Sequence, residues 1–354
     1  MDSNITYRKK DKGWQYIISY KENGKWKQKA KQGFSLKSDA KEAADKRLLE
    51  IKRELKDTIL DATYETITFN ELGNAFMNHS KLYKEYNSIE KIKNTIKKFN
   101  NLQDKKVKDI KKMHIQSCID DCIKEGLKYR TITTYLTQLK LILNYYKDNY
   151  DSSYIVPDKL KLPKKTAVEK KALTKEELLN LLEKLKQKND VLYIVSLLAG
   201  TTGLRIGEIE GLTWSDIQGN ELNVDKQWKR LKDGSVGFGS LKNNKKRMVP
   251  IPEKTLKELK EYHKTHPTDL TNRIIITNKF YLINTLNRTL KELAGVSVHE
   301  LRHTYATLLV ASNTMDFKTI AKILGHNVEQ TLKTYSHVND FMYKNAQEQI
   351  AKIF

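Results

Sequence analysis

The sequence predicts a multidomain, mainly α-helical protein with a small β-sheet at its N-terminus and a second small sheet inside its C-terminal part. Three observations support this prediction. Residues 13–34 alternate between large apolar and polar side chains, apolar residues recur at helical spacing through 69–150 and again beyond 172, and the stretch between these helical regions shows no period. A chain of 354 residues is long enough for two or three compact domains.

The first predicted domain, residues 1–62, begins with a β-hairpin. Tyr16, Ile18 and Tyr20 alternate with other residues along the first strand, and the Asn-Gly pair at 23–24 is typical of a tight hairpin turn. The return strand carries a lysine at every second position from 27 to 31. We interpret these lysines either as contacts to DNA phosphates or as a solvated face that protects an edge strand.

A helix is expected to complete this first domain. Ser38 is a candidate N-cap, and Ala40, Ala44 and Leu48 begin an apolar stripe at helical spacing. Because a two-stranded hairpin is only marginally stable, we also expect a third strand near 6–10 and packing of the sheet on the helix.

The second predicted domain, residues 63–152, is a helical bundle. Four apolar stripes at helical spacing predict four helices, and they lie at 69–76, 89–99, 115–123 and 132–146. The polar faces of these helices are rich in lysine, and the domain contains no catalytic constellation. Residues 153–171 contain Pro157 and Pro163 and have no helical period, which predicts a linker.

The third predicted domain, residues 172–354, is mainly helical with a small β-sheet. Thr174 and Glu177 have the spacing of a capping box at the start of its first helix. Residues 221–228 and 247–251 are predicted strands on either side of a turn region rich in Gly, Lys and Asn.

The composition favours a polyanionic partner. Lys and Arg number 65 against 43 Asp and Glu, a formal net charge of +22 that is spread over all parts of the chain. This spread favours a protein that lies along nucleic acid over one that binds a membrane through a basic tail. We expect no membrane span and an intracellular protein, and we interpret Cys118 and Cys122 as buried structural thiols.

The segment SVHELRHTYAT, residues 297–307, holds the densest cluster of chemically active side chains. Its spacing predicts a capped helix start, with His299 and Arg302 on one face near the positive end of the helix dipole, which favours an anion site. The same letters contain HExxH, the zinc-binding pattern of metallopeptidases, with His303 as the second histidine. Other features disfavour zinc: position 309 lacks the histidine of the extended metzincin pattern, and Arg302 would place a cation beside the metal, although Glu329 could serve as a third ligand.

Three further segments carry polar residues in the same domain. TTGLRIGE places Arg205 after a glycine and three residues before Glu208, which could orient the guanidinium or form a surface pair. GSLKNNKKRMVPI places Lys242 in a turn that leads to a strand. ILGHNVEQTLKTYSHV places His326 after a helix-ending glycine and Tyr335 nine residues later. Each of these residues, taken singly, is compatible with a structural role.

Taken jointly, these motifs resemble the catalytic signature of the site-specific tyrosine recombinases, the integrases of phages and conjugative elements. In order and local context, six residues match that signature: Arg205, Lys242, His299, Arg302, His326 and Tyr335. The motif resemblance covers residues 172–340. By organisation, residues 1–62 resemble the arm-binding domain of such integrases, 63–152 their helical core-binding domain, and 172–354 their catalytic domain.

The resemblance implies a reaction that cuts and rejoins DNA through a 3′-phosphotyrosyl link to Tyr335, without ATP, metal or other cofactor. It implies that arginines and His326 bind the phosphate, that Lys242 protonates the leaving oxygen, and that His299 assists loss of the phenol proton. Tyr305 is a rival nucleophile, although its helical position favours a core role.

The resemblance also implies partners: double-stranded DNA with core and arm attachment sites, a homotetramer on that DNA, and an excisionase and a DNA-bending factor as candidate accessory proteins. It places the protein in the bacterial cytoplasm, at the nucleoid when active. The C-terminal tail after His337 is expected to dock on a neighbouring subunit or on its own domain. The alternatives are a type IB topoisomerase, a DNA-binding regulator without catalysis, and the zinc peptidase.

Overall fold

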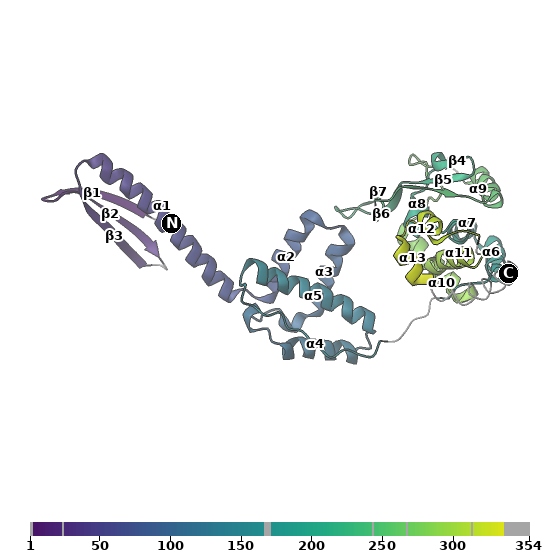
Figure 1. Cartoon of the computed structure of the whole chain (residues 1–354), viewed down its shortest axis with the longest axis horizontal. Coiled ribbons are helices and arrows are strands. Elements are labelled where there is room, and N and C mark those ends of the chain that lie inside the picture. Colours follow the sequence, from purple (N-terminus) through teal and green to yellow (C-terminus); the bar gives the residue numbers. More distant parts are fainter. Residues whose placement is uncertain are drawn as a thin grey trace, which may run out of the picture. The chain divides into compact units, whose positions relative to one another are not determined.

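The computed structural model describes residues 3–22, 25–165, 171–242, 244–266, 268–312 and 314–335. The chain divides into two compact units, Met1–Thr166 and Ala167–Phe354. Its elements are mainly helices with small antiparallel sheets, which confirms the predicted fold class (Figure 1). The Asn-Gly pair at 23–24 and the C-terminal tail lie outside the described residues. No helix in the described ranges has the length and apolar character needed to cross a membrane.

The N-terminal part of the first unit is a three-stranded antiparallel sheet covered by the start of a long helix (Figure 1). The strands, in the order β1-β2-β3, are β1 (Ser3–Lys10), β2 (Gly13–Glu22) and β3 (Lys25–Phe34), and the helix is α1 (Lys37–Thr66). Tyr16, Ile18 and Tyr20 form a small core with Ala44 and Ile51 of α1. The expected third strand and the packing on a helix are therefore confirmed.

The rest of the first unit has a separate hydrophobic core built by four helices. They are α2 (Phe69–Tyr83), α3 (Tyr86–Lys98), α4 (Lys112–Lys124) and α5 (Tyr129–Asn149), with short 3-10 turns at Asn100–Leu102 and Val107–Asp109. Cys118 and Cys122 are buried free thiols of α4. Burial raises the pKa of Cys118 to about 11, so this thiol stays protonated and unreactive at neutral pH. Tyr154, at the start of the predicted linker, is packed in the same core.

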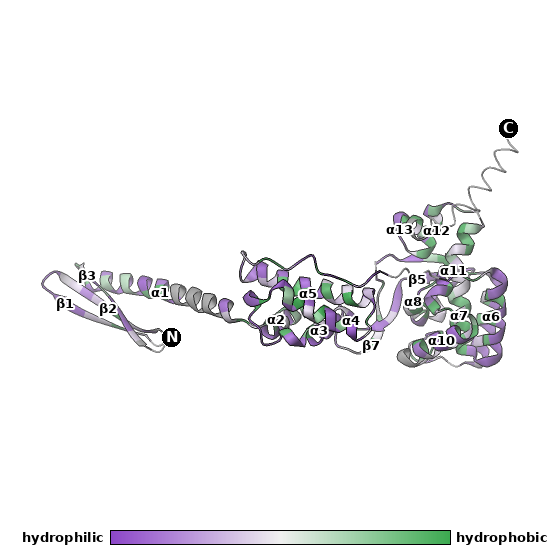
Figure 2. Ribbon diagram, turned by 90° about the horizontal axis from the view of Figure 1, so that it is seen from below, coloured by the Kyte–Doolittle hydropathy of each residue, from purple (hydrophilic) through white to green (hydrophobic). Residues whose placement is uncertain are grey.

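The second unit is mainly helical. Its helices are α6 (Lys175–Lys188), α7 (Asp190–Thr202), α8 (Ile206–Gly211), α9 (Glu253–Thr265), α10 (Lys279–Ala294), α11 (Val298–Ala311), α12 (Phe317–Leu324) and α13 (Val328–Tyr335). The most deeply buried is α7, whose residues from Leu192 to Gly200 are all buried. Figure 2 shows it as a largely hydrophobic ribbon among the other helices, while α6 carries hydrophilic residues. The predicted capping box of α6 is present, with Thr174 and Glu177 bonded to each other's backbone amides.

Two small sheets complete the second unit, and they correct the strands predicted from the sequence. The sheet β4-β5-β8 contains β4 (Ile217–Gln218), β5 (Glu221–Val224) and β8 (Arg247–Pro250); the other is a hairpin of β6 (Lys226–Arg230) and β7 (Val236–Ser240). The single predicted strand at 221–228 is thus two strands with different partners. The strand β7 was not predicted, because its two glycines suggest a turn.

Candidate active site

The first component of the site is the sharp turn between α7 and α8. Gly203 ends α7 with φ +66°, the left-handed conformation that favours glycine, and Arg205 is the N-cap residue of α8. The turn is tightly packed, because a Cβ built on Gly203 would lie 2.3 Å from Cδ1 of Tyr305. The carbonyl of Gly203 faces the site and accepts a hydrogen bond from Nη1 of Arg302 at 2.6 Å.

The replacement Gly203→Ala is expected to destabilise the second unit strongly. The positive φ costs about 1–2 kcal/mol for any residue with a Cβ, and the overlap with Tyr305 adds about 1–3 kcal/mol. Thermal unfolding measures the sum. The matched control is Gly219→Ala, where φ is +60° and no atom lies within 4 Å of the added Cβ. Equal losses of stability in the two variants would contradict the packing argument.

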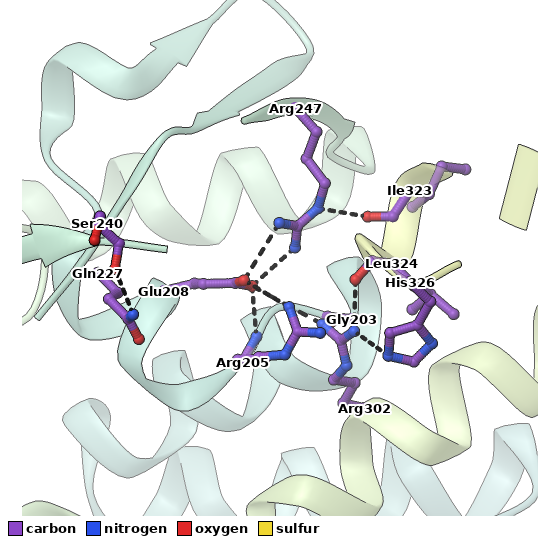
Figure 3. A network of polar contacts seen from close by, with 10 residues as sticks. All are labelled: Gly203, Arg205, Glu208, Gln227, Ser240, Arg247, Arg302, Ile323, Leu324 and His326. Atoms are coloured by element: carbon purple, nitrogen blue, oxygen red, sulfur yellow. Dashed lines mark hydrogen bonds and ion pairs between the residues drawn. The ribbon is translucent and has the colours of Figure 1, made fainter. Parts of the chain in front are cut away.

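The second component is Glu208, a buried carboxylate shared by several arginines (Figure 3). Its Oε1 accepts from Nη1 of Arg205 at 2.9 Å, and its Oε2 accepts from the backbone amide of Arg205 at 2.9 Å. Arg247 donates to the same two oxygens at 3.2 and 2.8 Å. Nη1 of Arg302 lies 3.9 Å from Oε2. Glu208 therefore orients Arg205, rather than forming a surface helical pair.

The third component is Arg302 on α11. Its side chain is 3% exposed, and Nη2 donates to the carbonyl of Leu324 at 2.5 Å and to Nε2 of His326 at 2.9 Å. With the bond to Gly203, these contacts hold one guanidinium between the α7–α8 turn and the end of α12. Glu300 caps α11 by accepting from the backbone amide of Ser297 at 2.7 Å, as the spacing predicts.

The fourth component is His326, which follows the glycine that ends α12. Gly325 has φ +64°, and this left-handed residue turns the chain so that the His326 ring meets Arg302 (Figure 3). Burial and the positive charges of Arg302, Arg205 and Arg247 lower the pKa of His326 to about 3. The ring is therefore neutral at physiological pH. Because Arg302 has only donors, Nε2 of His326 is the acceptor and Nδ1 carries the proton.

The site is electropositive. Arg205, Arg247 and Arg302 surround one carboxylate, so the guanidinium charges exceed the charge of Glu208. Burial acts to raise the pKa of Glu208, but hydrogen bonds and charge from Arg247 and Arg205 outweigh it and hold the pKa below its ordinary value. Glu208 therefore stays ionised, and the excess positive charge suits a phosphate. Arg205 is the most accessible of the three, with 28% of its side chain exposed.

The three remaining candidate residues lie on segments that are close in sequence to residues of this cluster. Lys242 is exposed in the turn that follows β7, and His299 is exposed in the first turn of α11. His299 is close enough for its charge to contribute to the lowered pKa of His326. Tyr335 is the last residue of α13, the helix that follows His326, and its side chain lies outside the described part of the structure.

The helix that carries Arg205 is locked to the β6–β7 hairpin by two glycines. Gly207 and Gly211, one helical turn apart on α8, face the backbone of β6. A Cβ on Gly211 would lie 2.8 Å from Cα of Gln227. The Gln227 side chain in turn donates to the carbonyl of Ser240 at 2.7 Å, joining β6 to the end of β7 just before Lys242 (Figure 3).

Sequence reasoning missed Arg247, the buried arginine of β8. It appears in the sequence as the third residue of a Lys-Lys-Arg run, and such runs are usually solvated. The alternation of the strand was the available signal. Arg247 and Val249 are buried, and the alternate residues Met248 and Pro250 are exposed.

The zinc hypothesis gains no support from the arrangement of side chains. His299 is exposed while His303 is 5% exposed and packed within the unit. Among the residues that the structure describes, no three His, Cys, Asp or Glu side chains gather as a metal ion would require.

Comparisons with known proteins agree with this architecture. Residues 171–341 match the Phage integrase family, and residues 5–51 match an Arm DNA-binding domain. The "Tyrosine recombinase XerC-like" protein of Caldanaerobacter subterraneus subsp. tengcongensis is 28% identical over 336 residues, covering 82% of this chain and 81% of the relative. "Tyrosine recombinase XerA" of Pyrococcus furiosus is 31% identical over 234 residues, covering 63% of this chain and 75% of the relative.

Solved structures share the fold. The Tn1549 transposon integrase in complex with transposon right end DNA has a TM-score of 0.68 at 19% identity, over 80% of this chain and 100% of that one. The lambda integrase tetramer bound to a Holliday junction has a TM-score of 0.59 at 18% identity, over 89% and 92% of the two chains.

Fold, site and relatives together define an enzyme of DNA strand transfer. The chain belongs to the tyrosine recombinase family.

Proposed function

We propose that this enzyme is a site-specific integrase that joins a mobile element to a chromosome by cutting and rejoining DNA, and that it can also support excision. One observation carries the proposal. Arg205, Arg302 and His326 come from three separate segments and meet in one electropositive cluster, and α13 leads from His326 to Tyr335.

The proposed chemistry is a transfer of the phosphodiester between two oxygens. The phenol oxygen of Tyr335 attacks the scissile phosphorus, the P–O5′ bond breaks, and a 3′-phosphotyrosyl link and a 5′ hydroxyl form. A 5′ hydroxyl of the partner strand then attacks that link and releases the tyrosine. Because the phosphoester bond is conserved at each step, no ATP is needed. The guanidinium groups of Arg205 and Arg302 supply the charge that stabilises the transferring phosphoryl group, so the proposal requires no metal or cofactor.

Two further residues are proposed to move protons. Lys242 donates a proton to the leaving 5′ oxygen, for which an exposed amine in a turn beside the DNA is suited. His299 accepts the phenol proton, since a phenol has an ordinary pKa of about 10 and loses its proton slowly without a base. His326 is proposed to bind a non-bridging phosphate oxygen.

The domains are proposed to divide the DNA between them. Residues 1–62 bind arm sites, 63–152 bind the core site together with the catalytic domain 172–354, and 153–171 link the two. The match of residues 5–51 to an Arm DNA-binding domain supports integration over the DNA relaxation of a type IB topoisomerase. The meeting of Arg205, Arg302 and His326 in one cluster argues against a regulator that has lost catalysis.

The face of the N-terminal sheet opposite α1 is the proposed arm-contacting surface. The register pairs Ser19 with Gln28 and Lys21 with Trp26 on this face. Trp26 is 60% exposed there. The register pairs lysines 27, 29 and 31 with Tyr20, Ile18 and Tyr16, whose side chains pack toward α1. Because β3 is an edge strand, we propose that these lysines contact phosphates along the edge of the sheet.

The proposed assembly is a homotetramer on two double-stranded attachment sites, since exchange of four strands uses four tyrosines. The lambda integrase tetramer on a Holliday junction supports this proposal by analogy of fold. We further propose that an excisionase and a DNA-bending factor assist, and that the protein acts on the nucleoid in the bacterial cytoplasm.

The test uses a pool of random-sequence duplexes, each nicked so that cleavage releases a short fragment and traps the covalent intermediate. The full chain is incubated with the pool in EDTA, and SDS-stable protein–DNA adducts are isolated and sequenced. We expect adducts that carry one recurring sequence and a free 5′ hydroxyl on the released fragment. Absence of any adduct, or adducts that form only when a metal ion is added, would overturn the proposed function.

A further inference from the structure

We propose that Arg247 is a positioning residue that holds the Arg205 segment and the His326 segment in fixed register for one phosphate. The inference rests on the proposed function, because it assigns Arg247 a part in building the same site. Arg247 touches no other candidate catalytic side chain in the contacts described above, and it acts through Glu208 and through the backbone of α12.

Arg247 is bonded to the backbone of α12. Nε of Arg247 donates to the carbonyl of Ile323 at 2.8 Å, three residues before His326. The guanidinium also packs on the turn itself, since a Cβ built on Gly325 would lie 3.0 Å from Nη1 and 3.2 Å from Cζ of Arg247. The Arg247 guanidinium thus packs against Gly325 in the space that a side chain at position 325 would need.

Arg247 is also bonded to the carboxylate of Glu208. Nη1 and Nη2 of Arg247 donate to the two carboxylate oxygens in a bidentate arrangement at 3.2 and 2.8 Å. The same oxygens hold the Arg205 side chain and its backbone amide. One planar guanidinium therefore connects the carboxylate that orients Arg205 with the last turn of α12, the helix that His326 follows.

The burial of this pair favours positioning over direct contact with DNA. The Arg247 side chain is 5% exposed and that of Glu208 is 3% exposed, whereas that of Arg205 is 28% exposed. Arg247 also neutralises part of the charge of Glu208. Without it, Glu208 would pair more fully with Arg205 and Arg302 and reduce the positive charge available to a phosphate.

The test is the cleavage rate of Arg247→Lys on the duplex selected by the random-pool assay. Lysine keeps the charge but cannot span both carboxylate oxygens and the Ile323 carbonyl. We expect the rate of adduct formation at saturating protein to fall about 100-fold, the cost of a displacement of about 1 Å in a catalytic group. The dissociation constant for the duplex is expected to change less than about threefold, because affinity depends mainly on phosphate contacts elsewhere.

A control separates this role from simple loss of stability. Leu259→Ala removes a fully buried side chain of α9, a helix that contributes no residue to the arginine cluster. It is expected to lower the unfolding temperature and to leave the cleavage rate of the folded protein unchanged. If Arg247→Lys does not fold, Gly325→Ala tests the same contact from the other side, with Gly219→Ala as its control for positive φ.

A second readout excludes an effect through Lys242, which lies five residues before Arg247. A thiolate leaves without needing a proton, so a substrate with sulfur in place of the bridging 5′ oxygen is expected to restore cleavage to Lys242→Ala. We expect it not to restore Arg247→Lys. Wild-type cleavage rates in Arg247→Lys, or full restoration by the sulfur substrate, would overturn the positioning role and leave the proposed function intact. Failure of the wild-type chain to form any adduct would instead be the failure of the proposed function.

Discussion

Tyr335→Phe is expected to abolish the covalent adduct with the selected nicked duplex. Phenylalanine keeps the ring but lacks the oxygen that is proposed to form the phosphotyrosyl bond, and it has no other nucleophile to offer. DNA affinity should change by less than about tenfold, because at most one hydrogen bond is removed. Gel analysis in SDS measures the adduct, and a mobility-shift titration of the same variant measures binding.

The matched control is Tyr305→Phe, which removes the hydroxyl of the rival tyrosine. The Tyr305 ring packs on Gly203, and burial raises the pKa of its phenol, which disfavours the phenolate. This variant is expected to form the adduct. An adduct that persists in Tyr335→Phe and disappears in Tyr305→Phe would move the nucleophile to α11.

Arg302→Lys is expected to slow cleavage about 100-fold to 1,000-fold, the usual cost of removing a donor that stabilises transition-state charge. The guanidinium of Arg302 bonds at once to the Gly203 carbonyl, the Leu324 carbonyl and Nε2 of His326. A lysine ammonium cannot reproduce this planar set of contacts. The single-turnover rate at saturating protein measures the effect apart from binding.

The same substitution at Arg288, an exposed residue of α10, serves as the control and is expected to leave the rate unchanged. The result for Arg302→Lys also has a structural signature. The positive charge of Arg302 is one of the causes that lower the pKa of His326. In Arg302→Lys the ammonium lies farther from the His326 ring, so the pKa of His326 is expected to rise. Wild-type rates in Arg302→Lys would remove this residue from the proposed phosphate site.

Much of the fold followed from local pattern. The hairpin, the four-helix region and the capped starts of α6 and α11 were predictable because alternation, helical spacing and capping residues are local signals. The split between β5 and β6 was not, because strand partners depend on residues far along the chain. The linker at 153–171 and the boundaries at 62 and 152 stay predictions.

The site was predictable only in part, and for a similar reason. Glycine and arginine in TGLRIGE and the histidine of LGH mark turns that can be recognised in the sequence. The sequence suggested that Glu208 could orient Arg205, but its burial and its sharing with Arg247 and Arg302 could not be recognised, because α8 is too short to show a period and Arg247 lies in a basic run. Convergence of separate segments on one carboxylate is a property of tertiary packing. The roles assigned to Lys242, His299 and Tyr335 stay predictions.

The glycine contacts between α8 and β6 divide the β6–β7 hairpin into two zones with different tolerance to change. At the base of the hairpin, the β6 backbone lies so close to Gly211 that a methyl group does not fit. A substitution there would push β6 away from α8 and displace Arg205. At its tip, residues 231–235 close on themselves through the bond from the Leu231 amide to the Ser235 carbonyl at 2.8 Å. We therefore expect insertions at the tip to lengthen the β6–β7 hairpin without displacing Arg205.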